Sequence, residues 1–198
     1  MPSRKYLLTP LYRAAVATVA ALVLSTVHAQ AADIPESKKT RLGFYMSALE
    51  ASQAVAADPG KVLFIDVRTP AEVMFIGAAD AADANVPFVE LANPATWDAK
   101  NNRLLLVRNE AFVTKVEKRL AAKKLGKSDR VVVMCRSGDR SAKAVDTLAD
   151  AGFTNVWTVI DGFEGDLSKD GRRDMNGWKN AGLPWTYKLD KTKLDLAP

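Results

Sequence analysis

The sequence predicts an α/β fold in which a central, mostly parallel β-sheet is flanked by helices on both faces. Three short runs, at residues 61–67, 130–134 and 155–160, are apolar almost throughout and rich in β-branched side chains. Segments with helical periodicity separate these runs along the chain. Apolar strands that alternate with helices are typical of a parallel sheet buried between two helical layers.

The first elements follow one another from residue 47. Ser47 and Glu50 have the spacing of a capping box, which predicts a helix beginning in SALEASQAVA. The apolar run KVLFIDV at residues 61–67 predicts a buried strand. ANVPFVEL, at residues 84–91, is a weaker strand candidate because apolar and polar residues do not alternate regularly in it.

The second half of the chain repeats this alternation. In NEAFVTKVEKRLAAKKLG, the side chains of Phe112, Val116 and Leu120 form one apolar stripe and Gly126 marks the end, which predicts a helix. The remaining predicted elements are, in order, a strand over 130–134, a helix over 141–152, a strand over 155–160 and a short helix over 176–185.

The first 31 residues have the composition of a secretory signal peptide. Arg4, Lys5 and Arg13 precede or flank an apolar run over residues 14–27, and the small-residue sequence AQA then ends at Ala31. The run is shorter than the roughly 20 residues that span a bilayer. We therefore expect cleavage after Ala31, a periplasmic mature protein and no stable membrane anchor, with an uncleaved anchor as the alternative.

Loss of this segment changes the charge and the histidine content. The whole chain carries 28 basic and 23 acidic residues, and three of the basic ones lie in the signal, so the mature net charge is +2. The basic stretch at residues 118–127 is typical of a solvated helix face, and we expect no nucleic-acid partner. The only histidine is His28, in the signal, and the only cysteine is Cys135. These counts exclude cysteine–histidine proteases, serine–histidine–aspartate hydrolases, histidine-containing zinc sites and intramolecular disulfides.

The loop CRSGDRS, at residues 135–141, joins the strand over 130–134 to a predicted helix. Ligands of parallel sheets bind at the carboxyl ends of strands, which is where this loop lies. Gly138 allows a tight turn, so the loop amides and the positive end of the helix can face one point. We therefore expect Cys135 to be a thiolate nucleophile rather than a buried core cysteine. Arg136 and Arg140 supply charges that suit an oxyanion.

Three motifs resemble the rhodanese family. VVVMCRSGDRSAKAVDTLADAGFTNVWTVIDGF is similar to its active-site region, with a C-R-x-G-x-R loop followed by an R-S-x-x-A helix. VLFIDVRTPAEV, at residues 62–73, resembles its strand followed by D-V-R and an acidic residue. NGWKNAGLPW resembles its usual ending. The three motifs occur in the family's order over roughly residues 47–187, and the resemblance implies a rhodanese-like three-layer fold.

The resemblance implies sulfur transfer. Cys135 would attack the sulfane sulfur of thiosulfate or a similar small anionic donor, release sulfite and hold the sulfur as a persulfide. A thiol, cyanide or a protein would then accept it, in a ping-pong sequence. The residues implied to bind the donor and the persulfide are Arg136, Ser137, Gly138, Asp139, Arg140 and Ser141. Among these, Arg140 would shape the loop and bind the donor oxyanion, and Arg136 would face the entrance.

Asp66 and Arg68 follow the first strand, close to the same edge of the sheet. The resemblance makes them a structural pair that braces the active-site loop, and a buried aspartate beside an arginine is usually a paired one. Glu72 either belongs to this brace or lies on the surface.

The chain departs from the family in two places. Most relatives have the stretch G-H-I-x-G-A after the D-V-R motif, and this chain has GAADAADANVP there. The chain also has an inserted loop, at about residues 164–176, which separates the glycine motif DGFEG from NGWKNAG. The inserted loop contains DLSKDG, which is similar to the start of a calcium-binding loop. Its twelfth position is Gly177 rather than the glutamate that would bind the ion, so we expect no metal and no cofactor.

The expected organisation is a signal peptide over 1–31, a leader over 32–46, the rhodanese domain over 47–187 and a tail over 188–198.

Two other functions remain as alternatives. Cysteine-dependent phosphatases use a similar cradle with five residues between cysteine and arginine, whereas four separate Cys135 from Arg140. A periplasmic sulfur carrier or binding module with little turnover would retain the same loop.

Overall fold

A computed structural model describes residues 34–195 of the chain. Its centre is a five-stranded sheet with the strand order β1-β10-β9-β2-β4, in which every neighbouring pair is parallel. The predicted α/β fold is thereby confirmed. The strands of this sheet are β1 (Tyr45–Met46), β2 (Val62–Asp66), β4 (Ala84–Asn85), β9 (Arg130–Met134) and β10 (Val156–Val159).

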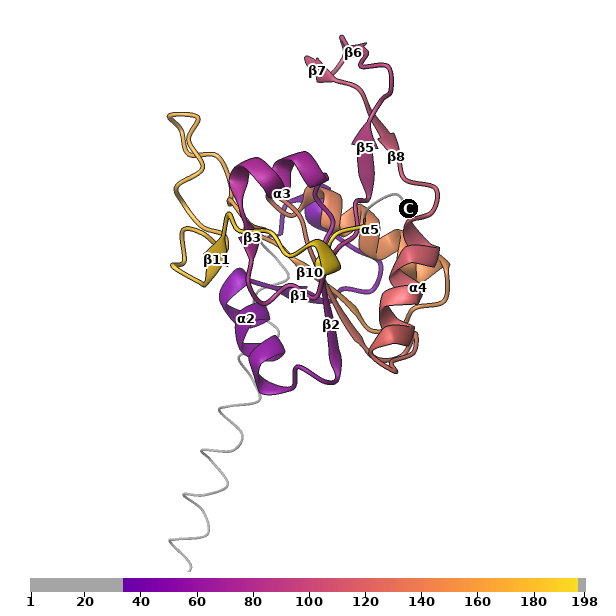
Figure 1. Ribbon diagram of the computed structural model, residues 1–198. Coiled ribbons are helices and arrows are strands. Elements are labelled where there is room, and N and C mark those ends of the chain that lie inside the picture. The colour runs from indigo at the N-terminus through magenta and orange to yellow at the C-terminus, as the bar shows by residue number, and fades with distance from the viewer. Residues whose placement is uncertain (1–33, 196–198) are drawn as a thin grey trace, which may run out of the picture. The chain divides into compact units, whose positions relative to one another are not determined.

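Helices cover both faces of the sheet. Figure 1 shows α2 on one side of β2, with α4 and α5 on the other. The helices are α2 (Ala48–Ala57), α3 (Pro70–Ile76), α4 (Phe112–Ala122) and α5 (Asp139–Asp150), with short 3-10 turns at Glu36–Lys38 and Lys191–Lys193. The capping box predicted at Ser47 and Glu50 is present at the start of α2.

Two apolar cores form because successive side chains of a strand point to opposite faces. Leu63 and Ile65 of β2 pack into the core beneath α4 and α5, whereas Phe64 packs into the core beneath α2. Neighbouring β9 follows the same alternation, since Leu63 is in register with Val131 and Phe64 with Val132. A continuous apolar run therefore supplies both cores, as expected for a strand that is covered twice.

The strand candidate at residues 84–91 is divided in the structure. Residues Ala84–Asn85 extend the central sheet beside β2, and Val89–Leu91 form β5 of a separate antiparallel pair. Pro87 lies between the two parts. Proline has no N–H to donate to a ladder, and the chain turns out of the sheet there.

The predicted helix over 176–185 is wrong. These residues form successive turns that lead into β11 (Trp185–Thr186), which pairs with β3 (Ala78–Ala79). The N–H groups of Trp178 and Lys179 donate to the carbonyls of Gly162 and Phe163 at 2.9 and 3.0 Å. Tertiary hydrogen bonds thus fix this segment as turns, and they override its local helical pattern.

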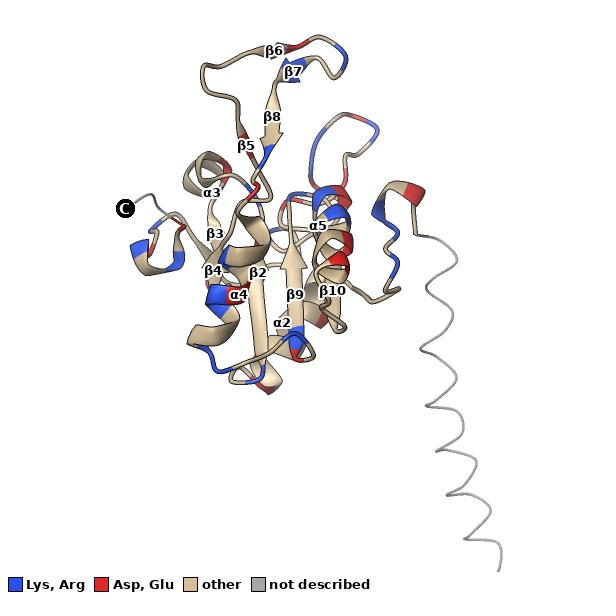
Figure 2. Cartoon of the chain, turned by 90° about the vertical axis from the view of Figure 1, so that its right-hand side faces the viewer, with Lys and Arg blue, Asp and Glu red and all other residues tan. Residues whose placement is uncertain are grey.

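A hairpin arm projects from the body of the molecule (Figures 1 and 2), and of its strands only β5 lies within a strand candidate of the sequence. Its base is the antiparallel pair of β5 with β8 (Leu106–Arg108), and its tip is the pair of β6 (Trp97–Asp98) with β7 (Arg103–Leu104). The tip turn is stabilised by Asp98, whose carboxylate accepts hydrogen bonds from Asn101, and by Asn102 at φ 50°. Asparagine and aspartate favour such turns because their short side chains bond to nearby backbone.

The expected signal peptide lies outside the described residues. Among residues 34–195, no helix combines the length and the apolar character that a membrane crossing requires.

We expect Trp178→Ala to lower the free energy of unfolding by about 3–5 kcal/mol, the usual range for removing a large buried aromatic side chain. Trp178 is fully buried, packs on Phe64 at 5.3 Å between ring centroids, and donates from Nε1 to the Pro184 carbonyl at 2.9 Å. Urea unfolding measures the change. Trp97→Ala in the arm is the matched control, because that side chain is 59% exposed and should change stability by less than about 0.5 kcal/mol. Equal losses in both variants would contradict the assigned core.

Candidate active site

The register of the parallel strands brings the predicted site residues to one edge of the sheet. Asp66 at the end of β2 is opposite Met134 of β9 on one side and Asn85 of β4 on the other. Cys135 follows Met134 directly, and α5 begins four residues later. The chain therefore places a thiol, an aspartate and a helix N-terminus at the carboxyl ends of adjacent strands.

Cys135 lies at the floor of a cavity of about 570 Å³. The residue is only 1% exposed, and its Sγ accepts a hydrogen bond from the Gly138 N–H at 3.2 Å. Arg136 and Ser137 of the same loop, and Asp139 and Arg140 at the start of α5, also line this cavity. The loop thus contributes both a backbone hydrogen bond to the sulfur and part of the cavity lining.

Gly138 allows the loop to close tightly. Its φ is 101°, and a Cβ at this position would lie 2.2 Å from the Ile160 carbonyl oxygen, a distance that no side chain can occupy. The end of the loop is fixed by Ser141, whose hydroxyl donates to the Gly138 carbonyl at 2.9 Å and accepts from Thr158 at 2.9 Å. Gly138 and Ser141 are therefore structural members of the loop.

The DGFEG segment holds the loop from the side of β10. Phe163 N–H donates to the Cys135 carbonyl at 2.8 Å, and Glu164 N–H donates to the Arg136 carbonyl at 3.0 Å. Gly162 comes so close that a Cβ on it would lie 2.6 Å from the backbone of Arg136. In the sequence, the two glycines of DGFEG bracket an aromatic residue, a pattern that already indicates a close approach of two backbone segments.

Asp66 and Arg68 form a buried ion pair beside the loop. Arg68 is fully buried, and its Nε and Nη2 contact the Asp66 carboxylate at 2.5–3.0 Å. Its Nη2 also donates to the Gly77 carbonyl at 2.8 Å, and its guanidinium lies 3.9 Å above the Phe163 ring. The pair thereby joins the end of β2, the end of α3 and the DGFEG segment. Its contacts are those of a brace, in keeping with the predicted role.

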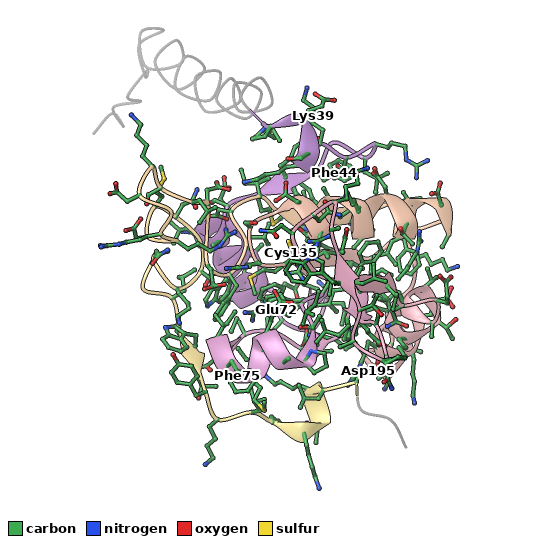
Figure 3. All side chains as sticks on the ribbon, turned by 90° about the horizontal axis from the view of Figure 1, so that it is seen from above. Lys39, Phe44, Glu72, Phe75, Cys135 and Asp195 are labelled. Atoms are coloured by element: carbon green, nitrogen blue, oxygen red, sulfur yellow. The ribbon has the colours of Figure 1, made fainter. Side chains whose placement is uncertain are left out.

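Glu72 binds Arg140 across the cavity wall. The two guanidinium Nη atoms of Arg140 contact the two carboxylate oxygens at 2.5 and 2.7 Å, and Figure 3 shows Glu72 on the side of α3 that is nearer to Cys135. Glu72 also completes a capping box with Thr69, which begins α3. The T-x-x-E pattern was the sequence signal for this helix, which the sequence analysis missed.

This pair decides the electrostatics around the loop. Burial alone would raise the pKa of Glu72, but hydrogen bonds and charge from Arg140, with further bonds from Thr69, hold it at about 2. Burial likewise opposes the charge of Arg140, but Glu72, with smaller contributions from Cys135 and Asp66, raises the pKa of Arg140. Both Nη atoms of Arg140 are therefore engaged, and the predicted oxyanion contact of Arg140 stays a prediction.

Three further arginines line the cavity: Arg103, Arg136 and Arg173. Arg136 is 43% exposed at its side chain and its Nε binds Glu164 at 2.8 Å. Arg173 comes from the inserted loop; it donates to the Gly165 carbonyl, while its Nε is buried without a hydrogen-bond partner among residues 34–195. Burial and the neighbouring Arg136 charge lower the pKa of Arg173. Sequence analysis did not identify Arg173, because nothing in the insertion indicates where its side chains point.

No group of three or more histidine, cysteine, aspartate or glutamate side chains within residues 34–195 is arranged to hold a metal ion. The calcium-like DLSKDG segment instead uses Asp166 to bind Lys38 at 2.6 Å and Asn176 at 2.8–3.1 Å.

We expect Glu72→Gln to reduce the dependence of stability on acid pH. A carboxyl with a folded pKa of about 2, below its ordinary 4.5, stabilises the fold fully above about pH 4.5 and loses this contribution as the pH falls towards 2. The variant should be less stable than the parent by about 1–3 kcal/mol near neutral pH, with the difference shrinking in acid. Urea unfolding from neutral to acid pH measures it. Glu117→Gln, which removes an exposed partner of Lys127, is the control and should differ little from the parent in free energy of unfolding at every pH. If the stability difference between Glu72→Gln and the parent does not change with pH, the low pKa assigned to Glu72 is wrong.

Comparison with known proteins agrees with this geometry. The family model described as the rhodanese-like domain matches residues 47–169. A chloroplastic protein of Arabidopsis thaliana named thiosulfate sulfurtransferase 16 is 30% identical over 121 residues, which cover 61% of this chain and 77% of that protein. An uncharacterised protein of Rickettsia conorii is 37% identical over 123 residues, covering 62% and 81%. A crystal structure of an M. tuberculosis protein superposes with a TM-score of 0.53 at 27% identity, covering 73% of this chain and 97% of that one. With its family match extending over more than half of the sequence, the chain belongs to the rhodanese-like domain family.

Proposed function

We propose that this chain is a sulfurtransferase that moves a sulfane sulfur from thiosulfate, or a similar small anionic donor, to a thiophilic acceptor through a persulfide on Cys135. The observation that carries the proposal is the placement of Sγ at the floor of an arginine-lined cavity, where it accepts a hydrogen bond from the Gly138 amide. A cysteine placed in this way can serve as the nucleophile of covalent catalysis without a histidine in the site.

The first half-reaction is a displacement at sulfur. The Cys135 thiolate attacks the outer sulfur of thiosulfate, a sulfur–sulfur bond forms, and the bond from that sulfur to the sulfonate group breaks. Sulfite leaves with the bonding electron pair, and the transferred sulfur carries the negative charge. The Gly138 amide and the N-terminus of α5 stabilise this anion, because both direct N–H dipoles towards the loop.

Arginines on the cavity wall bind the donor before the attack. Arg136 is exposed at the mouth, and Arg173 has a buried Nε that lacks a partner among the described residues. A sulfonate oxygen supplies the acceptor that such a donor needs. In the second half-reaction, an acceptor nucleophile removes the outer sulfur and restores the thiolate.

Mass spectrometry of the purified protein tests this function. Incubation with thiosulfate should add the mass of one sulfur atom to Cys135, and cyanide should remove it with formation of thiocyanate. Cys135→Ser should show neither change, and Ser137→Ala is a control that retains the thiol. Absence of an adduct on the reductant-free parent protein would refute the sulfurtransferase. A stable adduct that cyanide does not discharge, but a protein thiol does, would indicate a dedicated sulfur carrier instead.

We also propose that the chain is exported to the periplasm. The supporting observation is the sequence layout of residues 1–31, in which basic residues and an apolar run precede AQA. Expression of the full chain in a bacterial host, followed by fractionation and mass analysis, should yield a periplasmic protein that begins at Ala32. Replacement of Ala29 and Ala31 by lysine should leave the precursor uncleaved. A protein that remains whole in the cytoplasm would exclude export.

A further inference from the structure

The hairpin arm carries more apolar surface than its own folding needs. Its large exposed side chains are Leu91, Trp97, Leu104 and Val107, each between 42% and 59% exposed. A two-stranded hairpin in water is only marginally stable, because it has little apolar surface to bury within itself. Exposed apolar side chains that gather on one projecting element, rather than singly, mark a surface that contacts a partner.

The arm is continuous with the mouth of the active-site cavity. Leu91 and Leu106, which are opposite each other in the β5–β8 pair, line the cavity that ends at Cys135. Phe75 and Ile76 of α3 line it as well, and Phe75 is 74% exposed (Figure 3). The route to the thiol therefore has an apolar wall built from two separate elements.

The same mouth has an excess of positive charge. Four arginines and two carboxylates are among the described residues that line it. Arg136 and Arg140 are held by Glu164 and Glu72, whereas Arg103 of the arm and Arg173 form no ion pair within residues 34–195. An acidic group on a partner would complement these two arginines.

The extent of this surface argues for a polypeptide rather than a small thiol. Trp97 and Leu104 are cross-strand partners at the arm tip, and neither lines the cavity. A small thiol that reaches Cys135 through the cavity would leave both of them in water. A polypeptide can cover the tip and present a thiol to the cavity at the same time. In addition, each strand of the arm has a free edge, to which an extended segment of the partner can form backbone hydrogen bonds.

We propose that the arm, α3 and the unpaired arginines form the docking surface for a protein acceptor, which presents a cysteine flanked by apolar and acidic residues. This inference rests on the proposed sulfurtransferase function. In the transfer step, the Cys135 persulfide anion first takes up a proton from water, and the acceptor thiolate then attacks its outer sulfur. A sulfur–sulfur bond forms on the acceptor as the bond to Cys135 breaks, and Cys135 leaves as a thiolate, so no oxidant or reductant is needed.

Equilibrium binding tests the surface without relying on sulfur chemistry. The probe is a synthetic extended peptide with one cysteine flanked by glutamates and leucines, titrated into the otherwise intact Cys135→Ser protein. A matched peptide has lysines in place of the glutamates. Arg103→Glu should weaken binding of the acidic peptide by about tenfold and improve binding of the lysine peptide, whereas Lys100→Glu, at the arm tip outside the cavity, should do neither. A reversal of preference cannot arise from misfolding of the arm, and its absence would overturn the proposed charge recognition.

Transfer kinetics form the second arm of the experiment. In the persulfide-loaded protein, Trp97→Ser with Leu104→Ser should slow sulfur transfer to the acidic peptide by about tenfold or more, while persulfide formation and transfer to free cysteine stay unchanged. Leu49→Ser on α2, where the parent side chain is 52% exposed, is the matched control. Equal rates to free cysteine and to the peptide in the parent, or no effect of the double substitution, would overturn the docking surface. Failure to load Cys135 at all would refute sulfur transfer instead, and the binding measurement separates the two results.

Discussion

The close approach of Gly162 to the backbone of the Cys135 loop is the constraint on which the site depends. The loop must curve around the sulfur with its N–H groups facing inward, and isolated loops of this kind have no hydrogen-bonded ladder to hold them. Here the carbonyls of Cys135 and Arg136 accept from Phe163 and Glu164, which turns the outer side of the loop into a short ladder. Only a glycine at 162 allows that contact, since a Cβ would meet the Arg136 backbone at 2.6 Å.

Two ion pairs stabilise the segments that surround the Cys135 loop. Asp66 and Arg68 join the end of β2 to the carbonyl of Gly77 and the ring of Phe163, so the segment that supports the loop is itself held by an ion pair without access to water. Because each charge is compensated only by the other, removing one partner leaves an uncompensated buried charge. Glu72 and Arg140 form a second ion pair at the cavity wall, where both side chains are partly exposed. Cys135 thus lies beside two ion pairs, and the cavity arginines outside these pairs are Arg103, Arg136 and Arg173.

The sequence predicted the fold correctly where the local residue pattern alone determines the backbone structure. The strands over 130–134 and 155–160 and the pairing of Asp66 with Arg68 occur where they were expected, because parallel strands bring their carboxyl ends together. The expected loop from Cys135 to Ser141 is shorter in the structure, since α5 already begins at Asp139. The residue pattern did not predict the structure where contacts between segments distant in sequence determine it. Segment 176–185 looks helical, but its amides bond to Gly162 and Phe163. The arm has strands of two or three residues, too short to show alternation, and the position of Arg173 depends on how an insertion folds over the site.

The features that local sequence predicts concern the reaction at Cys135, whereas those that it does not predict concern the choice of acceptor. If the expected cleavage occurs, no histidine remains, and there is no second cysteine. In the proposed mechanism, activation of Cys135 therefore depends on the Gly138 amide, the start of α5 and nearby arginines. These groups are fixed by the sheet edge and do not depend on which molecule arrives. The residues that would distinguish acceptors, Phe75, Leu91 and Arg103, lie on the rim, and two of the three belong to the arm. Among the described residues the strands of the arm pair only with one another, so we expect substitutions at its exposed tip to leave the loop undisturbed and to alter the choice of partner in the proposed transfer.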